Sequence, residues 1–443
     1  MFKLKLVFVL IIAIVTALWL ASLSPGTFDG NFWALRRTLI YYSGILAMSM
    51  MSVAVILAAR PVLFESTLGG LDKFYRLHKW LGIGGVSLAI VHWMLELLPG
   101  WMVGQGWLVR PPRPAAPAAT ADLPFDPFRD LHGIARDLGE WGIYLLIALT
   151  VLALWKRFPY RYFFKTHRVM AALYLVFVFH AVVLMKPSYW PAPIGPAMAI
   201  LMLAGSIGAL LSLFHRIGYT RRAVGTIDHL DHHTGNSVLD VGVRLQTSWP
   251  GHLPGQFAFV TFDKSEGAHP FTMSSGWKGD GKLVFSIKGL GDYTKALPDT
   301  LRVGDSVTVE GPYGRFQFDD DGKRQIWVAG GIGISPFLAG LRELKGGRHE
   351  RPIDLVYCTS APDKRFIGTI RQLANDTGVR LHLLVQQSAG RLTASRLCEM
   401  VPQWAEAQVW FCGPQKFGAE LRDGLSEIGL PPGRFHQELF EMR

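Results

Sequence analysis

The chain divides into an apolar half and a half in which polar and apolar residues alternate. Up to about residue 215, long apolar runs are separated by short polar or basic stretches, whereas from Tyr219 onward the apolar runs are short. An apolar run of about 20 residues is long enough to cross a bilayer as a helix. The pattern therefore predicts six spanning helices, at residues 4–23, 38–59, 76–98, 138–155, 167–185 and 196–215.

The second half shows the period-two pattern of β-strands. SVLDVGVRLQ, GQFAFVTF, KLVFSIKGL and DSVTVEGPYG, separated by Gly, Asp and Pro turns, predict an antiparallel β-barrel. Beyond it, QIWVAGG, DLVYCTS, RLHLLVQ and QVWFCGP alternate with helical stretches, which is typical of a doubly wound α/β domain. We expect a multi-domain membrane protein with a six-helix transmembrane bundle at 1–217, an antiparallel β-barrel at 218–320 and an α/β nucleotide-binding domain at 324–443.

Composition and charge agree with this division. The chain has 443 residues, half of them hydrophobic, and a net charge of +11. Its basic residues gather in the loops after the second, fourth and sixth apolar segments, and the positive-inside rule makes these loops cytoplasmic. The charge is then mainly an orientation signal, and no nucleic-acid partner is expected.

The first apolar segment, residues 99–137 and the cysteines bear on topology and compartment. The first segment, MFKLKLVFVLIIAIVTALWLASLS, is interpreted as a retained helix, with a cleaved signal peptide as the alternative. Residues 99–137 are rich in Pro and Ala and predict an external loop. Cys358, Cys398 and Cys412 all lie in the second half, which fits a reduced compartment without structural disulfides.

Four histidines stand in the predicted membrane helices. His78 and His92 lie 14 residues apart in one segment, and His167 and His180 lie 13 apart in another. A histidine within a membrane is costly unless it has a ligand or partner. Each pair spans roughly 20 Å at about 1.5 Å per residue, so two such helices side by side would present two imidazole pairs at two depths. This predicts that His78, His92, His167 and His180 are the iron ligands of two haems.

The spacing of 13 conflicts with ideal helix geometry, because it does not return to the same helix face. The helix with His167 and His180 must therefore tilt, tighten or carry a local irregularity. Two alternatives remain open. The histidines could form a proton or metal pathway in a transport module joined to a flavin redox sensor, or they could be structural residues in helices that only anchor a flavin reductase.

The barrel contains the segment HPFTMSS, residues 269–275. A strand edge with a hydroxyl, an aromatic ring and backbone N–H groups suits a flavin, whereas ordinary barrel packing is the alternative. A Gly turn after the strand KLVFSIKGL supplies donors for a pyrophosphate. The flavin-binding candidates are His269, Pro270, Phe271, Thr272, Ser274, Ser275, Lys288, Gly291 and Thr294.

In the α/β part, GGIGISPF follows a strand and opens a helix, where backbone N–H groups can approach a diphosphate. The candidates there are Gly330, Gly331, Gly333, Ser335 and Pro336. Thr359 and Arg365 follow the next strand, where an adenosine ribose or its 2′-phosphate would lie; Arg365 favours NADPH, but the nearby Asp363 keeps NADH possible. The turn of Cys412, Gly413 and Pro414 ends a later strand, at the expected nicotinamide end.

Together these motifs resemble those of the ferric reductase/NADPH oxidase superfamily, in the form of a bacterial member. The two histidine pairs are similar to its haem helices, including the odd spacing, HPFTMSS to its flavin motif, GGIGISPF to its pyridine-nucleotide loop and CGP to its nicotinamide-side turn. FHQELF resembles the closing segment, in which an aromatic residue, here Phe440, covers the flavin. The resemblance implies that Phe440 and Cys412 belong to the catalytic site, and that FAD and two b-type haems are bound.

The resemblance also implies a function. Electrons would pass from cytoplasmic NADPH through FAD and the two haems to an external acceptor: oxygen, giving superoxide, or ferric iron, with a quinone or a periplasmic protein as further options. Glu96 stands where oxidases of the family often carry a second histidine, which puts specific oxygen chemistry in doubt. We expect the inner membrane of a bacterium, a cytoplasmic dehydrogenase domain and no obligatory protein subunit.

Overall fold

The computed structural model describes residues 2–28, 30–61, 69–110, 126–155, 157–318, 323–345 and 351–437. These residues fall into two compact units. The first comprises Met1–Leu68 with Lys73–Ile217, and the second Gly69–Asp72 with Gly218–Arg443. The domain boundaries proposed from the sequence stay predictions, and the two units are described separately below.

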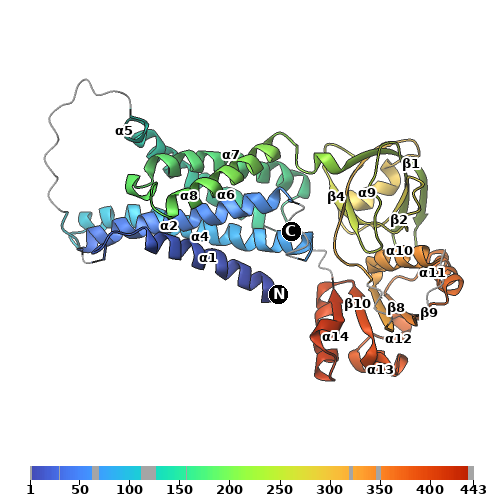
Figure 1. The fold of residues 1–443 in the computed structure, drawn as a ribbon. Coiled ribbons are helices and arrows are strands. Elements are labelled where there is room, and N and C mark those ends of the chain that lie inside the picture. Colours follow the sequence, from blue (N-terminus) through green and yellow to red (C-terminus); the bar gives the residue numbers. More distant parts are fainter. Residues whose placement is uncertain are drawn as a thin grey trace. The chain divides into compact units, whose positions relative to one another are not determined.

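Among its described residues, the first unit has six long helices that run side by side (Figure 1). They are α1 (Phe2–Ala21), α2 (Phe32–Ala58), α4 (Leu71–Gly104), α6 (His132–Leu154), α7 (Tyr160–Leu184) and α8 (Ile194–Leu213), with a short α5 (Pro127–Asp130) before α6 and a 3₁₀ turn η2 (Pro187–Tyr189) before α8. All six are long and apolar enough to cross a membrane. The six predicted segments are thus confirmed as apolar helices.

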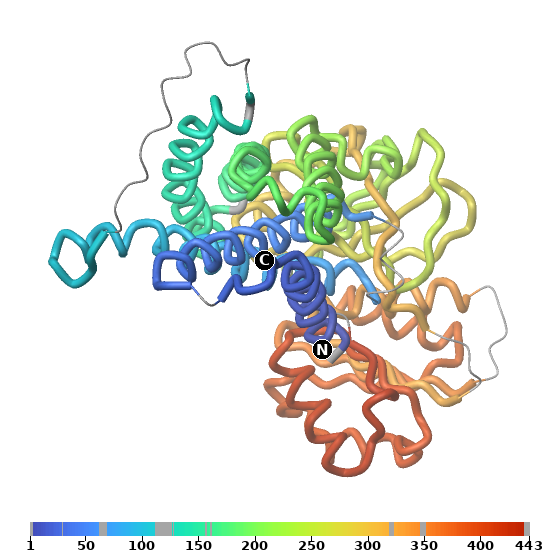
Figure 2. Tube along the Cα trace, turned by 60° about the vertical axis from the view of Figure 1, so that its left-hand side comes forward, coloured from blue at the N-terminus to red at the C-terminus, as the bar shows by residue number. Residues whose placement is uncertain are grey.

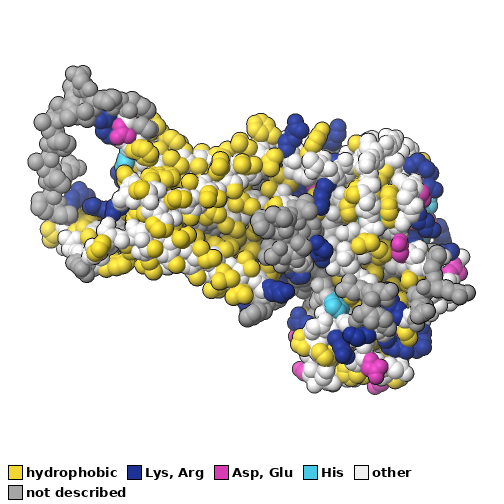
Figure 3. All heavy atoms as spheres, in the orientation of Figure 1, with side chains coloured by type: hydrophobic (Ala, Val, Ile, Leu, Met, Phe, Trp, Pro, Cys, Tyr) yellow, Lys and Arg dark blue, Asp and Glu magenta, His cyan; other side chains and the backbone are white. Residues whose placement is uncertain are grey.

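The surface of this unit suits lipid. Large apolar side chains on several helices are more than half exposed, among them Val9, Ile14, Val151, Ile200 and Leu203. Figure 3 shows hydrophobic side chains covering most of the visible surface of the bundle. Water would oppose so large an apolar surface, whereas a hydrocarbon environment does not. The chain is therefore a multi-pass membrane protein.

Helix α4 runs further than the sequence predicted. Residues 99–104 were expected in the external loop, but α4 continues through Pro99 to Gly104, so that prediction was wrong. Pro99 has no N–H to donate to the carbonyl of Leu95 four residues earlier. Arg36 of α2 replaces that donor, because its Nε donates to the Leu95 carbonyl at 2.7 Å. Residues 111–125, the middle of the expected loop, lie outside the described residues.

The second unit begins with an antiparallel sheet and one helix, α9 (Asp292–Thr300). Its strands are β1 (Arg222–His233), β2 (Val238–Leu245), β3 (Phe257–Thr261), β4 (His269–Thr272), β5 (Lys282–Lys288) and β6 (Ser306–Tyr313), in the order β4-β3-β6-β1-β2-β5. The edge strands approach each other just beyond β4: Met273 bridges to Phe285, and Ser274 N donates to Val284 O at 2.7 Å. The sheet therefore curls toward closure around an apolar core.

A parallel five-stranded sheet follows, in the order β11-β10-β7-β8-β9. Its elements are β7 (Gln325–Gly330), η4 (Gly331–Ile334), α10 (Ser335–Leu344), β8 (Ile353–Thr359), α11 (Lys364–Thr377), β9 (Arg380–Val385), α12 (Gln386–Ala389), α13 (Ala394–Met400), β10 (Gln408–Cys412), α14 (Gln415–Glu427) and β11 (Phe435–Gln437). Alternate residues of β7 face opposite sides. Trp327 and Ala329 pack with α10 and α11, and Ile326 and Val328 pack with α13 and α14.

Figure 2 shows the same layering, with the red α13 and α14 on the side of the sheet away from the orange α10 and α11. Helices on both faces explain why these strands read as nearly continuous apolar runs. The fold class expected from the sequence, an apolar helical bundle followed by an antiparallel-sheet domain and a parallel α/β domain, is confirmed.

Candidate functional site

The four membrane histidines form two facing pairs. The ring centres of His78 and His167 lie 5.8 Å apart, and those of His92 and His180 lie 6.2 Å apart. Two imidazoles bound to opposite sides of one metal ion, with bonds of about 2 Å, place their ring centres about 6 Å apart. The two distances therefore suit a shared ligand at each level.

Backbone hydrogen bonds fix the orientation of most of these rings. Three rings bond through Nδ1 to a carbonyl of a neighbouring helix: His78 to Ala54 at 2.8 Å, His92 to Ile40 at 2.9 Å and His180 to Ala135 at 2.8 Å. A carbonyl only accepts, so Nδ1 carries the proton and the lone pair of Nε2 is available as a ligand. Among the described residues His167 Nδ1 has no hydrogen-bond partner, and its ring stacks on Phe163 at 5.1 Å.

Two glycines that the sequence reasoning missed make room for the rings. A Cβ on Gly44 of α2 would lie 3.1 Å from the His92 ring, and a Cβ on Gly139 of α6 would overlap the ring of His180. Both glycines lie on helices other than those that carry the histidines. The sequence gives no signal for them, because the helix pairing that brings them to the rings is a tertiary property.

The donor set fits haem better than a bare metal ion. Within the described part of the chain no three His, Cys, Asp or Glu side chains gather as a metal site. Each histidine pair offers two ligands, which is what haem needs, because the porphyrin supplies the other four. The predicted irregularity in the second histidine helix is absent, since α7 is an unbroken α-helix.

The flavin motif lies on β4 and the turn after it. β4 is an edge strand over His269–Thr272, and the His269 ring stacks on Tyr293 of α9 at 4.3 Å. Burial lowers the pKa of His269 to about 4, so the imidazole is neutral at pH 7. Burial also raises the pKa of Tyr293, and the carboxylates of Asp263 and Glu266 raise it further. These neutral aromatic groups give this edge a surface that suits a flat ring system.

Other predicted flavin residues bond within the protein. The Ser274 hydroxyl contacts Ser286 Oγ at 3.0 Å, and the Ser275 hydroxyl accepts from Val284 N at 3.1 Å. Thr294 Oγ1 accepts from Gly291 N at 3.1 Å, so this pair caps α9. These contacts shape the turns, and the roles of all these residues toward a cofactor stay predictions.

The nucleotide motifs meet at the carboxyl ends of the parallel strands β7 and β10. β7 pairs with β10, but the chain leaves β7 toward β8 and β9, so the strand order reverses between β7 and β10. A Cβ on Gly413 would lie 3.0 Å from Gly330 Cα, and a Cβ on Gly333 would overlap the Cys412 carbonyl. The GGIG and CGP segments are thus in direct contact, where sheets of this type bind ligands.

Gly331 follows β7 at this end of the sheet. Its φ is +58°, which favours glycine, and the nearest atom to a Cβ there would be Lys288 Nζ, 3.9 Å away. Lys288 ends β5, so the structure brings a predicted flavin residue beside the predicted nucleotide loop. Ser335 and Pro336 form the first turn of α10, whose N–H groups suit a phosphate.

The predicted adenosine contacts already have partners within the protein. Thr359 is buried, and its Oγ1 accepts from Ala361 N at 3.2 Å. Arg365 Nη2 donates to both carboxylate oxygens of Asp231 on β1, at 2.7 Å each. A 2′-phosphate would therefore compete with Asp231 for this guanidinium. Phe440 lies outside the described residues.

Fold and site define a class, a multi-pass membrane protein with paired internal histidines and a two-part nucleotide-binding unit. Residues 43–178 match the family model described as a ferric reductase like transmembrane component, and residues 232–317 match the model of an FAD-binding domain. The chain thus unites a ferric-reductase-like transmembrane domain with a ferredoxin-reductase-type FAD-binding domain, and the resemblance to the ferric reductase/NADPH oxidase superfamily is confirmed.

Known proteins resemble parts of the chain. Vanillate O-demethylase oxidoreductase of Pseudomonas sp. is 29% identical over 33% of this chain and 45% of its own length. An NADPH oxidoreductase of Mycobacterium tuberculosis is 31% identical over 39% of this chain and 47% of its own. The chain therefore spans about half the length of these relatives. Among solved structures, a cytochrome P450 reductase from Amycolatopsis is similar with a TM-score of 0.45 and 21% identity, over 50% of this chain and 70% of its own.

Proposed function

We propose that this protein is a transmembrane oxidoreductase that carries electrons from cytoplasmic NADPH, through FAD and two b-type haems, to an acceptor on the other side of the membrane. The observation that carries the proposal is the pair of histidine contacts at 5.8 and 6.2 Å in a chain that also has an FAD-binding domain. The NADPH oxidoreductase among the relatives supports the choice of donor.

Different residues would bind the different cofactors. His78 with His167, and His92 with His180, would hold the two haems; the edge of β4 would hold FAD; and the glycines of GGIG and CGP would admit NADPH. When bound, FAD takes a hydride from NADPH and passes its electrons on singly, and haem carries one electron at a time. The protein binds and orients these groups, and its apolar helices exclude water from the path.

The electron acceptor would be oxygen, which one electron reduces to superoxide, or ferric iron. Beyond His92, Glu96 bonds to Arg36 Nη2 at 2.5 Å. A carboxylate paired to a guanidinium stands where oxidases of the resembled family often carry a second histidine, and this argues against specific oxygen chemistry. A quinone or a periplasmic redox protein is the alternative acceptor.

The test is a visible spectrum of the purified full-length chain in detergent. With FAD and NADPH under argon, we expect the sharp bands of six-coordinate b-type haem that NADPH reduces. His92→Ala or His180→Ala should remove about half of this signal, whereas His132→Ala, a change at an exposed histidine of the same unit, should leave it intact. Ferric citrate or air, admitted afterwards, identifies the acceptor by the faster reoxidation. A preparation without a Soret band contradicts the proposal and supports a transport module.

A further inference from the structure

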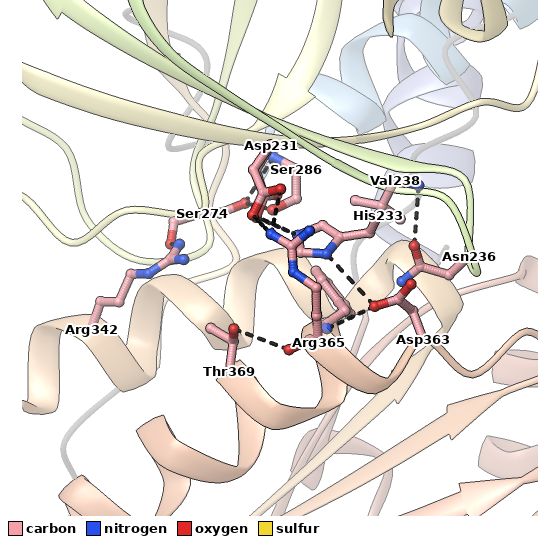
Figure 4. A network of polar contacts seen from close by, with 12 residues as sticks. Asp231, His233, Asn236, Val238, Ser274, Ser286, Arg342, Asp363, Arg365 and Thr369 are labelled. Carbon is pink, nitrogen blue, oxygen red and sulfur yellow. Dashed lines mark hydrogen bonds and ion pairs between the residues drawn. The ribbon is translucent and has the colours of Figure 1, made fainter.

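The end of the flavin motif is held by residues outside its own strand. Arg342 Nη1 of α10 donates to the Ser274 carbonyl at 2.5 Å (Figure 4), and His252 Nε2 donates to the Ser275 carbonyl at 2.8 Å. Ser274 is fully buried and Ser275 nearly so. Because both carbonyls are bonded, the backbone of this turn has one fixed orientation.

The same turn packs directly on α10. A Cβ on Gly276 would lie 3.0 Å from the backbone nitrogen of Glu343 and 2.7 Å from its carboxylate. Any larger residue at 276 would push the turn away from the helix. Arg342 and Gly276 are thus two independent observations of one close junction between the flavin motif and α10.

Helix α10 joins this junction to the nucleotide loop. The helix starts at Ser335, directly after the GGIG turn, and Arg342 lies two turns further on, about 10 Å along the axis. The helix is buried along most of its length. A short, packed helix does not bend, so the position of one end determines that of the other.

The charge of Arg342 is retained in this setting. Burial lowers the pKa of the guanidinium, and the Asp240 carboxylate raises it. Arginine stays protonated in proteins, so the bond to Ser274 is charge-assisted, which makes it stronger than a bond between neutral groups. A lysine could reach a carbonyl, but it lacks the planar fork of donors.

We propose that Arg342 is a positioning residue for hydride transfer: through Ser274 it fixes the distance between the flavin motif and the GGIG loop, and hence between the two cofactors. The inference rests on the proposed function, in that FAD and NADPH bind at these motifs. A hydride moves only over a short, aligned contact, and a misplacement of about 1 Å can cost about a hundredfold in rate. Arg342 touches neither reacting atom.

The test compares Arg342→Met and Arg342→Lys in the full-length chain with FAD bound. Stopped-flow reduction of the flavin by NADPH should be slower by about tenfold to a hundredfold in Arg342→Met, with the KM for NADPH nearly unchanged, and partly restored in Arg342→Lys. The flavin absorbance change on adding NADP⁺ should also shrink in Arg342→Met, while FAD content stays at the wild-type level. Lys345→Met is the control, since this lysine of the same region pairs at the surface with Asp376 at 2.8 Å.

The outcomes separate the two proposals. A wild-type protein that binds no FAD, or that NADPH does not reduce, contradicts the proposed function. If the wild type is reduced and both Arg342 variants match it in rate and in the NADP⁺ response, the positioning role is wrong while the function stands. If Arg342→Met loses FAD but the flavin that remains bound is reduced at the wild-type rate, the positioning role is also wrong. Should Arg342→Met not fold, Arg342→Lys still decides through its rate and spectrum.

Discussion

At the scale of single residues, the membrane histidines owe their chemistry to backbone atoms. Ile40, Ala54 and Ala135 bond to ring nitrogens only through their carbonyls. A backbone carbonyl carries no residue signature, so the histidines could be predicted from the sequence but their partners could not. The partner of Arg365 could not be predicted for a different reason: the sequence analysis assigned this arginine to a nucleotide, whereas the fold brings it to the carboxylate of Asp231, which is far away in the sequence.

Gly139 offers a residue-scale prediction. Because a Cβ at this position overlaps the His180 ring, Gly139→Leu should displace that imidazole and lower the haem content from two per chain toward one. Gly133→Leu is the matched control on the same helix, since a Cβ there meets no atom of the described residues within 4 Å. Haem would be measured by pyridine haemochrome per mole of protein. Full haem content in Gly139→Leu would contradict the inference that His180 needs the space at Gly139 to hold haem.

At the scale of elements, the periodic pattern predicted the long helices and most of the strands. It missed β1, because RAVGTIDHLDHH mixes polar residues into a central strand that pairs with both β2 and β6. It also ended the third spanning helix too early, at Pro99. There a side chain of another helix, Arg36, satisfies the carbonyl that proline leaves, and local sequence cannot reveal such a partner.

Asp354 provides an element-scale prediction, because it ties together the starts of three parallel strands. Its buried carboxylate bonds to Arg324 at 2.6 Å and His382 at 3.0 Å, with Arg380 at 3.4 Å. Asp354→Asn should destabilise the second unit by about 2 kcal/mol, since the neutral amide loses the charge-assisted bonds to Arg324 and His382 and turns a donor toward donors. Asp376→Asn, which breaks an exposed pair with Lys345, should cost less than about 1 kcal/mol. Thermal unfolding monitored by flavin fluorescence measures both.

The pH dependence of this effect has a definite sign. Burial acts to raise the pKa of Asp354, but the bond from His382 and the charges of Arg380 and Arg324 outweigh it and hold the pKa below its ordinary value. Its stabilisation is thus present above the unfolded-state pKa of about 4 and is lost as pH falls through the lower folded-state pKa. The gap in melting temperature between wild type and Asp354→Asn should narrow only in that acid range. A gap that is constant down to pH 3 would argue against the ion-pair account.

At the scale of the whole molecule, the two halves could be predicted from different kinds of sequence feature. The membrane half was predictable because length, apolarity and four histidines leave few alternatives, whereas the second half needed several weak motifs together. Gly330 and Gly333 are far from Cys412 in the sequence, yet the segments meet at the carboxyl ends of β7 and β10, which the α/β topology implies. The way in which the predicted flavin motif is held, with Arg342 bonded to Ser274, depended on tertiary contacts that no periodicity encodes.

The whole-molecule prediction concerns the direction of electron flow. In lipid vesicles that contain the full-length chain, NADPH added outside reaches only molecules whose nucleotide unit faces outward, so reduction of ferric citrate trapped inside requires a path through the membrane helices. His92→Ala should slow this internal reduction by about tenfold or more, because it removes a ligand of the second pair. Reduction of ferricyanide outside, which can take electrons at the flavin, should continue at the wild-type rate.

Comparing the rates for the internal and the external acceptor distinguishes a broken electron path from a general defect of the protein. A defect in folding or in NADPH binding would lower both rates together, whereas a broken path lowers only the internal one. His132→Ala, which removes an exposed histidine of the same unit, should lower neither. If the wild type itself reduces no trapped ferric citrate, the helices only anchor a flavin reductase, because electrons that cross the bilayer must use a carrier inside it. If His92→Ala reduces trapped ferric citrate as fast as the wild type, His92 holds no carrier on the path.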